Sequence, residues 1–400
     1  MKDDKKVPQL RFPEFTDAWK QRKLRDIGAI VTGNTPKTSD KGNYGNDYLF
    51  VSPADIQQNR YIKNTQTKLT KKGFLTGKPI RKGASLFVCI GSTIGKVAQT
   101  VEESVSNQQI NALIPFVSFC DDFVFTLLET LALKVKSIAS NQAVPIINKS
   151  TFGSTECLVP SIIEEQQKIG AFFTQLDSTI TLQQRKLNSL QKLKKGLLQK
   201  MFPKKGENIP EIRFPEFSDA WKQRKFGDFA KVSMCKRIFK EETTQTGDVP
   251  FFKIGTFGGI PDAFISRYKF ESYKAKYPYP KKGDILISAS GSIGRIVEYS
   301  GKDEYFQDSN IIWLDHDESV LNSFLKHVYS IIKWNGIEGT TIKRLYNDNV
   351  LTTKILTPSL EEQSKIGTFF TQLDNTITLQ QRKLESLQKL KKGLLQQMFI

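Results

Sequence analysis

The sequence contains few of the residues from which catalytic and metal sites are built. Only two of its 400 residues are histidines, His316 and His327, and the first half of the chain has none. A catalytic set of serine, histidine and aspartate repeated in both halves is therefore excluded. The four cysteines show no C-x-x-C spacing, so we expect neither a zinc site nor a disulfide framework.

Sequence motifs of common nucleic-acid enzymes are missing as well. There is no N/D-P-P-Y/F sequence, which marks amino-methyltransferases, and no helicase or nuclease motif. Residues Gly91–Val97, GSTIGKV, are one residue short of the phosphate-binding pattern G-x-x-x-x-G-K and lack the serine or threonine that would follow it. We therefore expect a protein that binds its targets without catalysing a reaction and that holds no cofactor.

Long apolar runs are also absent. The first residues, MKDDKKVPQL, contain no apolar stretch of the kind found in secretory signals. No uncharged run approaches the ~20 residues needed to cross a bilayer. We expect a soluble cytoplasmic protein that has no membrane partner.

Positive charge is what the chain has in excess. Its 59 Lys and Arg against 41 Asp and Glu give a net charge of +18 and a pI near 9.5. Such an excess favours polyanionic partners, chiefly nucleic acid or an anionic membrane surface, although a basic protein that is merely soluble is the alternative. The 38% of hydrophobic residues, with 28 phenylalanines, is enough to fill two cores.

The strongest pattern is an internal duplication. Residues Glu164–Phe202 and Glu361–Phe399 differ at five of 39 paired positions, and Arg11–Lys23 differs from Arg213–Lys225 at one of 13. The segments between these repeats are mostly unlike each other. Constant segments usually provide partners and geometry, whereas variable segments usually provide specificity.

Each long repeat predicts a helix with a narrow apolar seam. The apolar residues follow spacings of three and four, which is typical of a coiled coil rather than of the broad face of a globular helix. Each helix would be ~58 Å long at 1.5 Å per residue. The seam of the first copy is Phe173, Leu176, Ile180, Gln183, Leu187, Leu190 and Leu197, and that of the second is Phe370, Leu373, Ile377, Gln380, Leu384, Leu387 and Leu394.

A glutamine interrupts both seams at the same place, at Gln183 and Gln380. In an antiparallel pair these two amides can face each other and fix the register at some cost in stability. We therefore predict an antiparallel coiled coil with a pseudo-twofold internal repeat, the alternative being that each helix packs on its own globular domain. Ser161 and Ser359 precede acidic residues and are the predicted N-caps.

The variable segments predict an α+β fold. Short β-rich runs such as Ser85–Ile90 and Asp284–Ser288 alternate with turn residues, while Phe123–Ile138 and Val320–Trp334 are typical of amphipathic helices. With the prolines that precede the long helices, these patterns divide the chain into four parts. Residues 1–160 and 204–358 are two mixed α/β domains, and residues 161–203 and 359–400 are the two helices.

One local feature recurs in both variable segments and suggests contact with DNA. A basic turn leads into a strand and then into a Gly-Ser loop that ends in a cation, a combination that suits phosphate contact. A tight strand-to-strand turn with solvated cations explains the pattern equally well. Two clusters of Asn and Gln could in addition pair with adenine edges. The predicted DNA-binding residues are Arg81, Lys82, Ser92, Thr93, Lys96, Asn107, Gln108, Lys281, Lys282, Ser292, Arg295, Gln307 and Asn310.

Basic and aromatic residues also alternate in the variable segments. Tyr61 and Lys63 are one example, and Arg267, Tyr268 and Lys269 are another. Such cations could neutralise phosphates and make binding sensitive to salt. A solvated loop is the alternative for any single one of these residues.

The layout resembles that of the specificity subunits of Type I restriction-modification systems. In that family each variable domain is followed by a long helix that begins with a proline, a short apolar stretch and Glu-Gln. The matching residues here are Pro160 with Glu165 and Gln166, and Pro358 with Glu362 and Gln363. Arg11–Trp19 and Arg213–Trp221 also look typical of the family's domain starts, and the resemblance covers essentially the whole chain.

The resemblance implies a non-catalytic DNA-binding subunit. Each variable domain would be a target recognition domain that reads one half of a split, asymmetric sequence in double-stranded DNA. The antiparallel helices would set the spacer and dock two modification subunits, which methylate adenine, and restriction subunits with motor and nuclease activity could then join. A coiled-coil scaffold that bridges proteins and an RNA-binding protein are the alternatives.

Overall fold

The chain forms two compact units, and each of two long helices contributes to both. The computed structural model describes residues 7–57, 59–139, 145–334 and 344–400. Unit 1 contains Met1–Lys186 and Gln380–Ile400, and unit 2 contains Leu187–Leu379. The boundaries of the units therefore fall inside the helices α5 (Ile163–Lys200) and α9 (Leu360–Met398). The predicted division into four parts at the ends of the helices stays a prediction.

Unit 1 is built on three small sheets. The five-stranded sheet has the order β2-β9-β6-β7-β4, the three-stranded sheet has the order β5-β3-β8, and β1 pairs with β10. The strands are β1 (Lys20–Lys23), β2 (Gly28–Thr32), β3 (Tyr44–Val51), β4 (Tyr61–Ile62), β5 (Thr67–Leu69), β6 (Ser85–Val88), β7 (Val97–Thr100), β8 (Ser104–Ser106), β9 (Ile110–Pro115) and β10 (Glu156–Val159). The shorter helices are α1 (Leu24–Ile27), η1 (Lys41–Asn43), α2 (Lys71–Thr76), α3 (Asp121–Ala139) and α4 (Lys149–Ser154).

Unit 2 repeats this topology with a different sequence. Its sheets have the orders β12-β18-β15-β16, β14-β13-β17 and β11-β19. The strands are β11 (Lys222–Lys225), β12 (Ala230–Ser233), β13 (Val249–Phe252), β14 (Phe264–Ile265), β15 (Ile285–Ser288), β16 (Ile296–Glu298), β17 (Tyr305–Phe306), β18 (Ile311–His316) and β19 (Lys354–Thr357). The helices are η2 (Phe226–Asp228), η3 (Lys240–Glu242), α6 (Arg267–Lys276), α7 (Asn322–Ile331) and α8 (Asn347–Thr352). Within the described residues of unit 2, no strand takes the place of β4.

The predicted α+β fold is confirmed. The strands expected from Ser85 and from Asp284 are β6 and β15, and the two expected amphipathic helices are α3 and α7. The second helix ends at Ile331, three residues before the predicted Trp334. Among the helices that the structure describes, none has the length and apolar character to cross a membrane.

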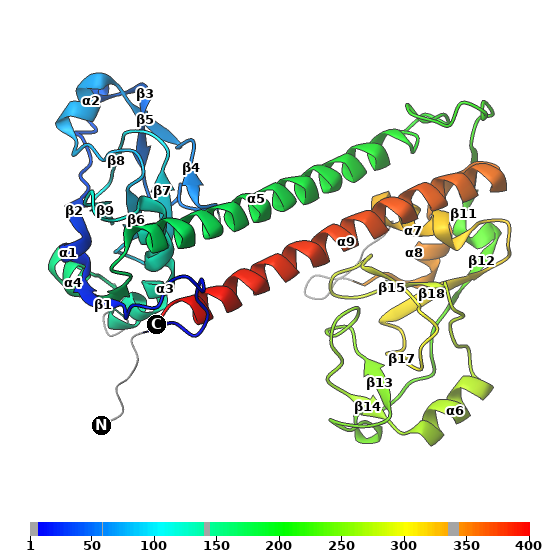
Figure 1. Ribbon diagram of the computed structural model, residues 1–400. Helices are drawn as coiled ribbons and strands as arrows, with labels where there is room; N and C mark the ends of the chain where they lie inside the picture. Colours follow the sequence, from blue (N-terminus) through cyan, green and yellow to red (C-terminus); the bar gives the residue numbers. More distant parts are fainter. Residues whose placement is uncertain (1–6, 58, 140–144, 335–343) are drawn as a thin grey trace. The chain divides into compact units, whose positions relative to one another are not determined.

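The two long helices pack antiparallel inside unit 1. Asp177 on α5 pairs with Lys391 on α9 at 2.6 Å, and Phe173, one turn earlier, lies 6.1 Å from Phe399 between ring centroids. Positions therefore rise along α5 as they fall along α9. In Figure 1 the red end of α9 lies beside the first turns of α5 and close to α3. Phe399 completes the core there, because its ring also meets Trp19 at 5.9 Å.

Unit 2 contains the same contacts with the copies exchanged. Asp374 on α9 pairs with Lys194 on α5 at 2.5 Å, and Phe370 lies 6.3 Å from Phe202. Each of these pairs is related to a pair of unit 1 by the 197-residue offset between the repeats. Phe202 meets Trp221 at 5.7 Å, as Phe399 meets Trp19 in unit 1.

The predicted seam lies on the packed side of both helices. Its two glutamines face each other, because the side-chain amide of Gln380 donates a hydrogen bond to the side-chain oxygen of Gln183. Buried seam residues are Phe173, Leu187, Phe370, Gln380 and Leu384, and partly buried ones are Leu176, Ile180, Gln183, Leu190, Leu197, Leu373, Ile377, Leu387 and Leu394. Antiparallel pairing of the helices is therefore confirmed in each unit.

One of the two predicted N-caps is wrong. Helix α9 begins at Leu360, and the Ser359 hydroxyl accepts a hydrogen bond from the Glu362 amide at 3.3 Å, as an N-cap should. Helix α5 begins at Ile163, so Ser161 lies one residue too early to cap it. The reason is an extra isoleucine after Ser161, which the second copy lacks.

Candidate nucleic-acid interface

The two Gly-Ser loops are turns between antiparallel strands. The first connects β6 to β7, with φ of +91° at Gly91 and +92° at Gly95. The second connects β15 to β16, with φ of +63° at Gly291 and +82° at Gly294. Positive φ is accessible to glycine without steric cost, which explains the glycines. The turn is one of the two interpretations of the pattern, and contact of these loops with DNA stays a prediction.

The structure brings each Gly-Ser loop against the polar cluster of the same unit. In unit 1 the Cys89 amide donates to the Gln109 carbonyl at 2.8 Å. In unit 2 the Ala289 amide donates to the Asn310 carbonyl at 2.8 Å, and the Ser290 hydroxyl donates to the Asn310 side chain at 2.7 Å. Two features that were predicted separately thus form one polar edge in each unit.

Several predicted DNA-binding side chains are already engaged within the protein. The Arg81 guanidinium forms a two-pronged ion pair with Asp121, with both N–O distances 2.7 Å. Lys96 Nζ donates to the Ile56 carbonyl at 3.0 Å. Arg81 and Lys96 therefore hold neighbouring segments in place, which favours a structural role for both.

The predicted amides are engaged as well. The Asn107 side chain donates to the Gln109 side-chain oxygen and accepts from the Gln109 backbone amide, at 3.1 Å each. The Gln108 side chain accepts from the Thr35 hydroxyl at 2.8 Å, and the Gln307 side chain accepts from the Ile254 amide at 2.9 Å. Thr93 is partly buried. The exposed members of the predicted set are Arg81, Lys82, Ser92, Gln108, Lys281, Lys282, Ser292 and Arg295.

A buried arginine in unit 1 is a feature that the sequence did not reveal. Arg60 directly precedes β4, and its side chain is 2% exposed. The guanidinium donates to Gln99 at 2.9 Å and to Asp122 at 2.8 Å, and it pairs with Asp177 of α5 at 3.3 Å. A buried charge is retained only when it is paired and hydrogen-bonded, and Arg60 meets that condition. It thereby ties β4 to the long helix.

Lys391 extends this network to the end of α9. It bonds Asp177 at 2.6 Å and Glu129 of α3 at 2.8 Å. Burial raises the pKa of the Glu129 carboxyl, and the charge of Lys391 opposes that shift. The members of this network lie far apart in the sequence. Only Asp177 and Lys391 carry a signal in the sequence, because they lie in the two long repeats.

The Glu-Gln pair at the start of each long helix anchors that helix through hydrogen bonds. Glu165 accepts two hydrogen bonds from Arg11, at 2.6 and 2.8 Å, and Glu362 accepts two from Arg213, at 2.7 and 2.8 Å. The following glutamine accepts from the chain just before α3 or α7, at 3.0 Å in unit 1 and 2.9 Å in unit 2. Both residues thus fasten the helix to its own unit.

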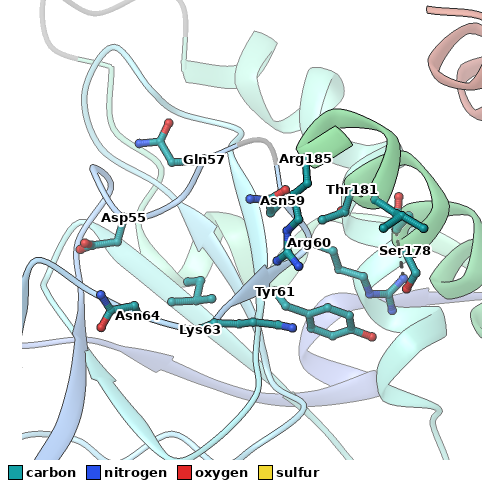
Figure 2. Close-up of a pocket in the computed structure, with 13 residues that line it drawn as sticks. Asp55, Gln57, Asn59, Arg60, Tyr61, Lys63, Asn64, Ser178, Thr181 and Arg185 are labelled. Carbon is teal, nitrogen blue, oxygen red and sulfur yellow. Dashed lines mark hydrogen bonds and ion pairs between the residues drawn. The ribbon is translucent and has the colours of Figure 1, made fainter. Parts of the chain in front are cut away.

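A cavity of about 480 Å³ lies beside Arg60. Tyr61 borders it from β4, and Lys63 borders it from just after that strand. Thr181 and Arg185 border it from α5. Figure 2 shows the side chains of Lys63 and Arg185 reaching into the same hollow from these two elements. Groups of His, Cys, Asp and Glu that could hold a metal ion do not occur in the described parts of the chain.

This chain belongs to the Type I restriction modification DNA specificity domain family, whose model matches it twice. The matches cover residues 16–192 and 218–389. Each match contains one α+β unit's variable segment and a large part of the long helix that follows. The family explains why the same topology and the same Glu-Gln start recur at both helices.

Relatives and solved structures agree with this assignment. A putative Type I restriction enzyme specificity subunit of Haemophilus influenzae is 58% identical over 156 residues, which are 38% of this chain and 40% of that protein. The MjaIX specificity subunit of Methanocaldococcus jannaschii is 24% identical over 94% of this chain and 91% of its own length. The crystal structure of a Type I restriction-modification S subunit from M. genitalium has the same fold, with a TM-score of 0.67, 17% identity and coverage of 98% and 99%.

Proposed function

We propose that this chain is the non-catalytic DNA-reading subunit of a Type I restriction-modification complex and that it recognises a bipartite duplex target. The observation that carries the proposal is one topology built twice with different side chains at equivalent places. The Gly-Ser turn of unit 1 carries Thr93 and Lys96, whereas that of unit 2 carries Ile293 and Arg295. Equal scaffolds with unlike contact residues suit two unlike half-sites, so the target is asymmetric.

The near-identical helices have a separate role in this proposal. Residues 161–203 and 359–400 set the spacing between the half-sites that residues 1–160 and 204–358 read. Their exposed leucines support docking of two equal partners: Leu182 and Leu379 are 63% and 65% exposed, and Leu193 and Leu390 are 52% exposed each. Repeated apolar side chains on an exposed helix face are typical of protein interfaces.

We infer that one modification subunit, an adenine methyltransferase, binds each of these surfaces. Restriction subunits with motor and nuclease activity join through the assembled complex. The methylation and cleavage chemistry then resides in the partners, and the complex acts on DNA in the cytoplasm.

A filter-binding titration of the full chain against duplex DNA across salt concentrations tests the proposal. The expected result is tight binding at low salt that weakens linearly in a plot of log K against log[salt], because lysines and arginines displace counterions. Binding that is absent or flat with salt supports a scaffold instead. Equal competition by single-stranded RNA supports an RNA-binding protein.

Sequencing of methylated adenines in cells that express the complex then gives the target. The proposal expects a split motif with two different halves. A palindromic or continuous motif contradicts it.

A further inference from the structure

The cavity beside Arg60 has an uneven balance of charge. Arg60 is fully engaged with Gln99, Asp122 and Asp177, as described above. Asp177 is engaged in turn by Arg60 and Lys391. The other acidic residue of the lining, Asp55, accepts from the Ser52 amide and hydroxyl at 2.9 and 2.6 Å and from the Gln66 amide at 2.8 Å. The carboxylates of this cavity are therefore already satisfied.

Two cations of the lining are not engaged in the same way. Within the described residues, neither Lys63 nor Arg185 has a hydrogen bond or an ion pair, and both are exposed. They approach the cavity from opposite walls, Lys63 from beside β4 and Arg185 from α5 (Figure 2). Hydroxyl groups of Tyr61, Ser178 and Thr181 also border the cavity and can donate hydrogen bonds. Leu182, one of the exposed leucines of the proposed docking surface, lies at its edge as well.

We propose that Lys63 and Arg185 bind a phosphate group of the DNA backbone in this cavity. A guanidinium presents a planar fork that matches two phosphate oxygens, and a lysine adds a mobile charge on the other side. A volume of about 480 Å³ falls in the usual range for ligand sites, so a phosphate with part of its sugar can enter. This inference rests on the proposed function, because it takes the phosphate from duplex DNA.

The proposed site belongs to unit 1 and has no counterpart among the described residues of unit 2. Arg382 is the matching arginine of the second copy, and it does not border this cavity. The opposite wall depends on β4, and unit 2 has no such strand among its described residues. The phosphate contact therefore belongs to the half-site that unit 1 reads, and Arg382 is a control that differs only in its surroundings.

Salt titration of the full chain with its duplex target tests the proposal. The variants are Arg185→Gln, Lys63→Gln and the control Arg382→Gln, and circular dichroism verifies that each is folded. Loss of one phosphate contact should reduce the slope of log K against log[salt] by about 0.9. If variant and wild type bind equally at 1 M salt, a slope lower by about 0.9 makes the variant bind about fivefold more weakly at 0.15 M salt.

The proposal expects both effects in Arg185→Gln and Lys63→Gln and neither in Arg382→Gln. Calorimetry with inorganic phosphate should show no binding to the wild-type chain, and saturable binding would mean that a free phosphate is the ligand instead. If the wild-type slope is steep and the two variants keep it, the cavity is not a phosphate site and the proposed function stands.

If the wild-type chain shows no salt-dependent binding to duplex DNA, the proposed function fails together with this site. If the variants keep their DNA affinity but lose a modification subunit, the cavity binds protein and the proposal is overturned.

Discussion

The Gln380 side chain donates a hydrogen bond to the Gln183 side chain, and these two residues are the same position of the two repeats. Gln380 is only 7% exposed, so its amide depends on Gln183, whose backbone carbonyl also accepts from it at 3.4 Å. A polar residue inside an apolar seam disfavours every register in which it faces a hydrophobic side chain. The pair thus specifies how far one helix is shifted along the other.

Substitution of one glutamine should therefore destabilise the chain, and substitution of both should not. Gln183→Leu leaves the buried Gln380 amide with only the long 3.4 Å hydrogen bond to the backbone carbonyl of residue 183, which should lower the free energy of unfolding by about 1–3 kcal/mol. The double variant with Gln380→Leu should recover that loss, because two leucines can pack in the seam. Urea denaturation measures both. A single variant as stable as the double variant would contradict the pairing.

Lys391 and Lys194 occupy equal positions of the repeats but different surroundings, so they form a matched pair of substitutions. Lys391→Met leaves Asp177 and Glu129 without their shared cation and should cost about 3 kcal/mol. Lys194→Met removes one partly exposed pair with Asp374 and should cost about 1 kcal/mol or less. Equal losses in urea denaturation would show that the network around Arg60 adds nothing.

Stability should fall in mild acid because of His327, which is 1% exposed in α7. Burial lowers the pKa of His327 to about 4, whereas the unfolded chain titrates near 6.5. Between these pH values the His327 side chain takes up the proton only in the unfolded state. Acid therefore stabilises the unfolded state, and the free energy of unfolding should fall by up to ~3 kcal/mol as the pH falls from about 6.5 to 4.

His327→Phe should remove this contribution while keeping an aromatic ring against Phe370, which lies 4.8 Å away. Compared with the wild type, the variant should gain stability progressively between pH 6.5 and 4. Urea denaturation at several pH values measures the difference, with Ser330→Ala on the same helix as the control. A constant difference across that range would show that His327 does not contribute.

Lengthening both helices by the same amount should change the spacer of the DNA target. Seven residues inserted after Gln183 and after Gln380 keep the seam in phase and add ~10 Å at 1.5 Å per residue, or about three base pairs. Mapping of methylated adenines should show the same half-sites with a longer spacer. Altered half-site bases would contradict the assigned role of the helices.

The exposed leucines allow a test of partner binding. Leu193→Glu and Leu390→Glu each place a charge on one of two equal surfaces and should each remove one modification subunit from the complex. The double variant should bind none, as measured by the mass of the purified complex. Gln191→Glu, two residues earlier on α5, about half a turn around the helix and also exposed, is the control.

The sequence predicted the parts of the fold that repeat. Two copies with one seam must present the same face, so the meeting of Gln183 and Gln380 followed from their equal positions. It did not predict Arg60, because its partners Gln99 and Asp177 come from distant segments and the second unit has no counterpart of β4. Ser161 was predicted to be a cap from its neighbours alone, and one inserted isoleucine displaced it.

The candidate DNA contacts were harder to predict because contacts between distant segments decide which side chains are available. A surface lysine and a lysine that holds a loop look alike in a sequence, and Lys96 proved to bond the Ile56 carbonyl. Only three-dimensional contacts separate the engaged cations from the available ones, such as Lys63.

Because each unit uses one stretch of each long helix, the order of synthesis limits the order in which the two units can finish folding. All of unit 2, Leu187–Leu379, leaves the ribosome before Gln380–Ile400, which unit 1 needs. Trp19 and Phe123 are among the first core residues made, yet their ring partner Phe399 comes near the end of the chain. The first domain to be translated is therefore the last that can finish folding.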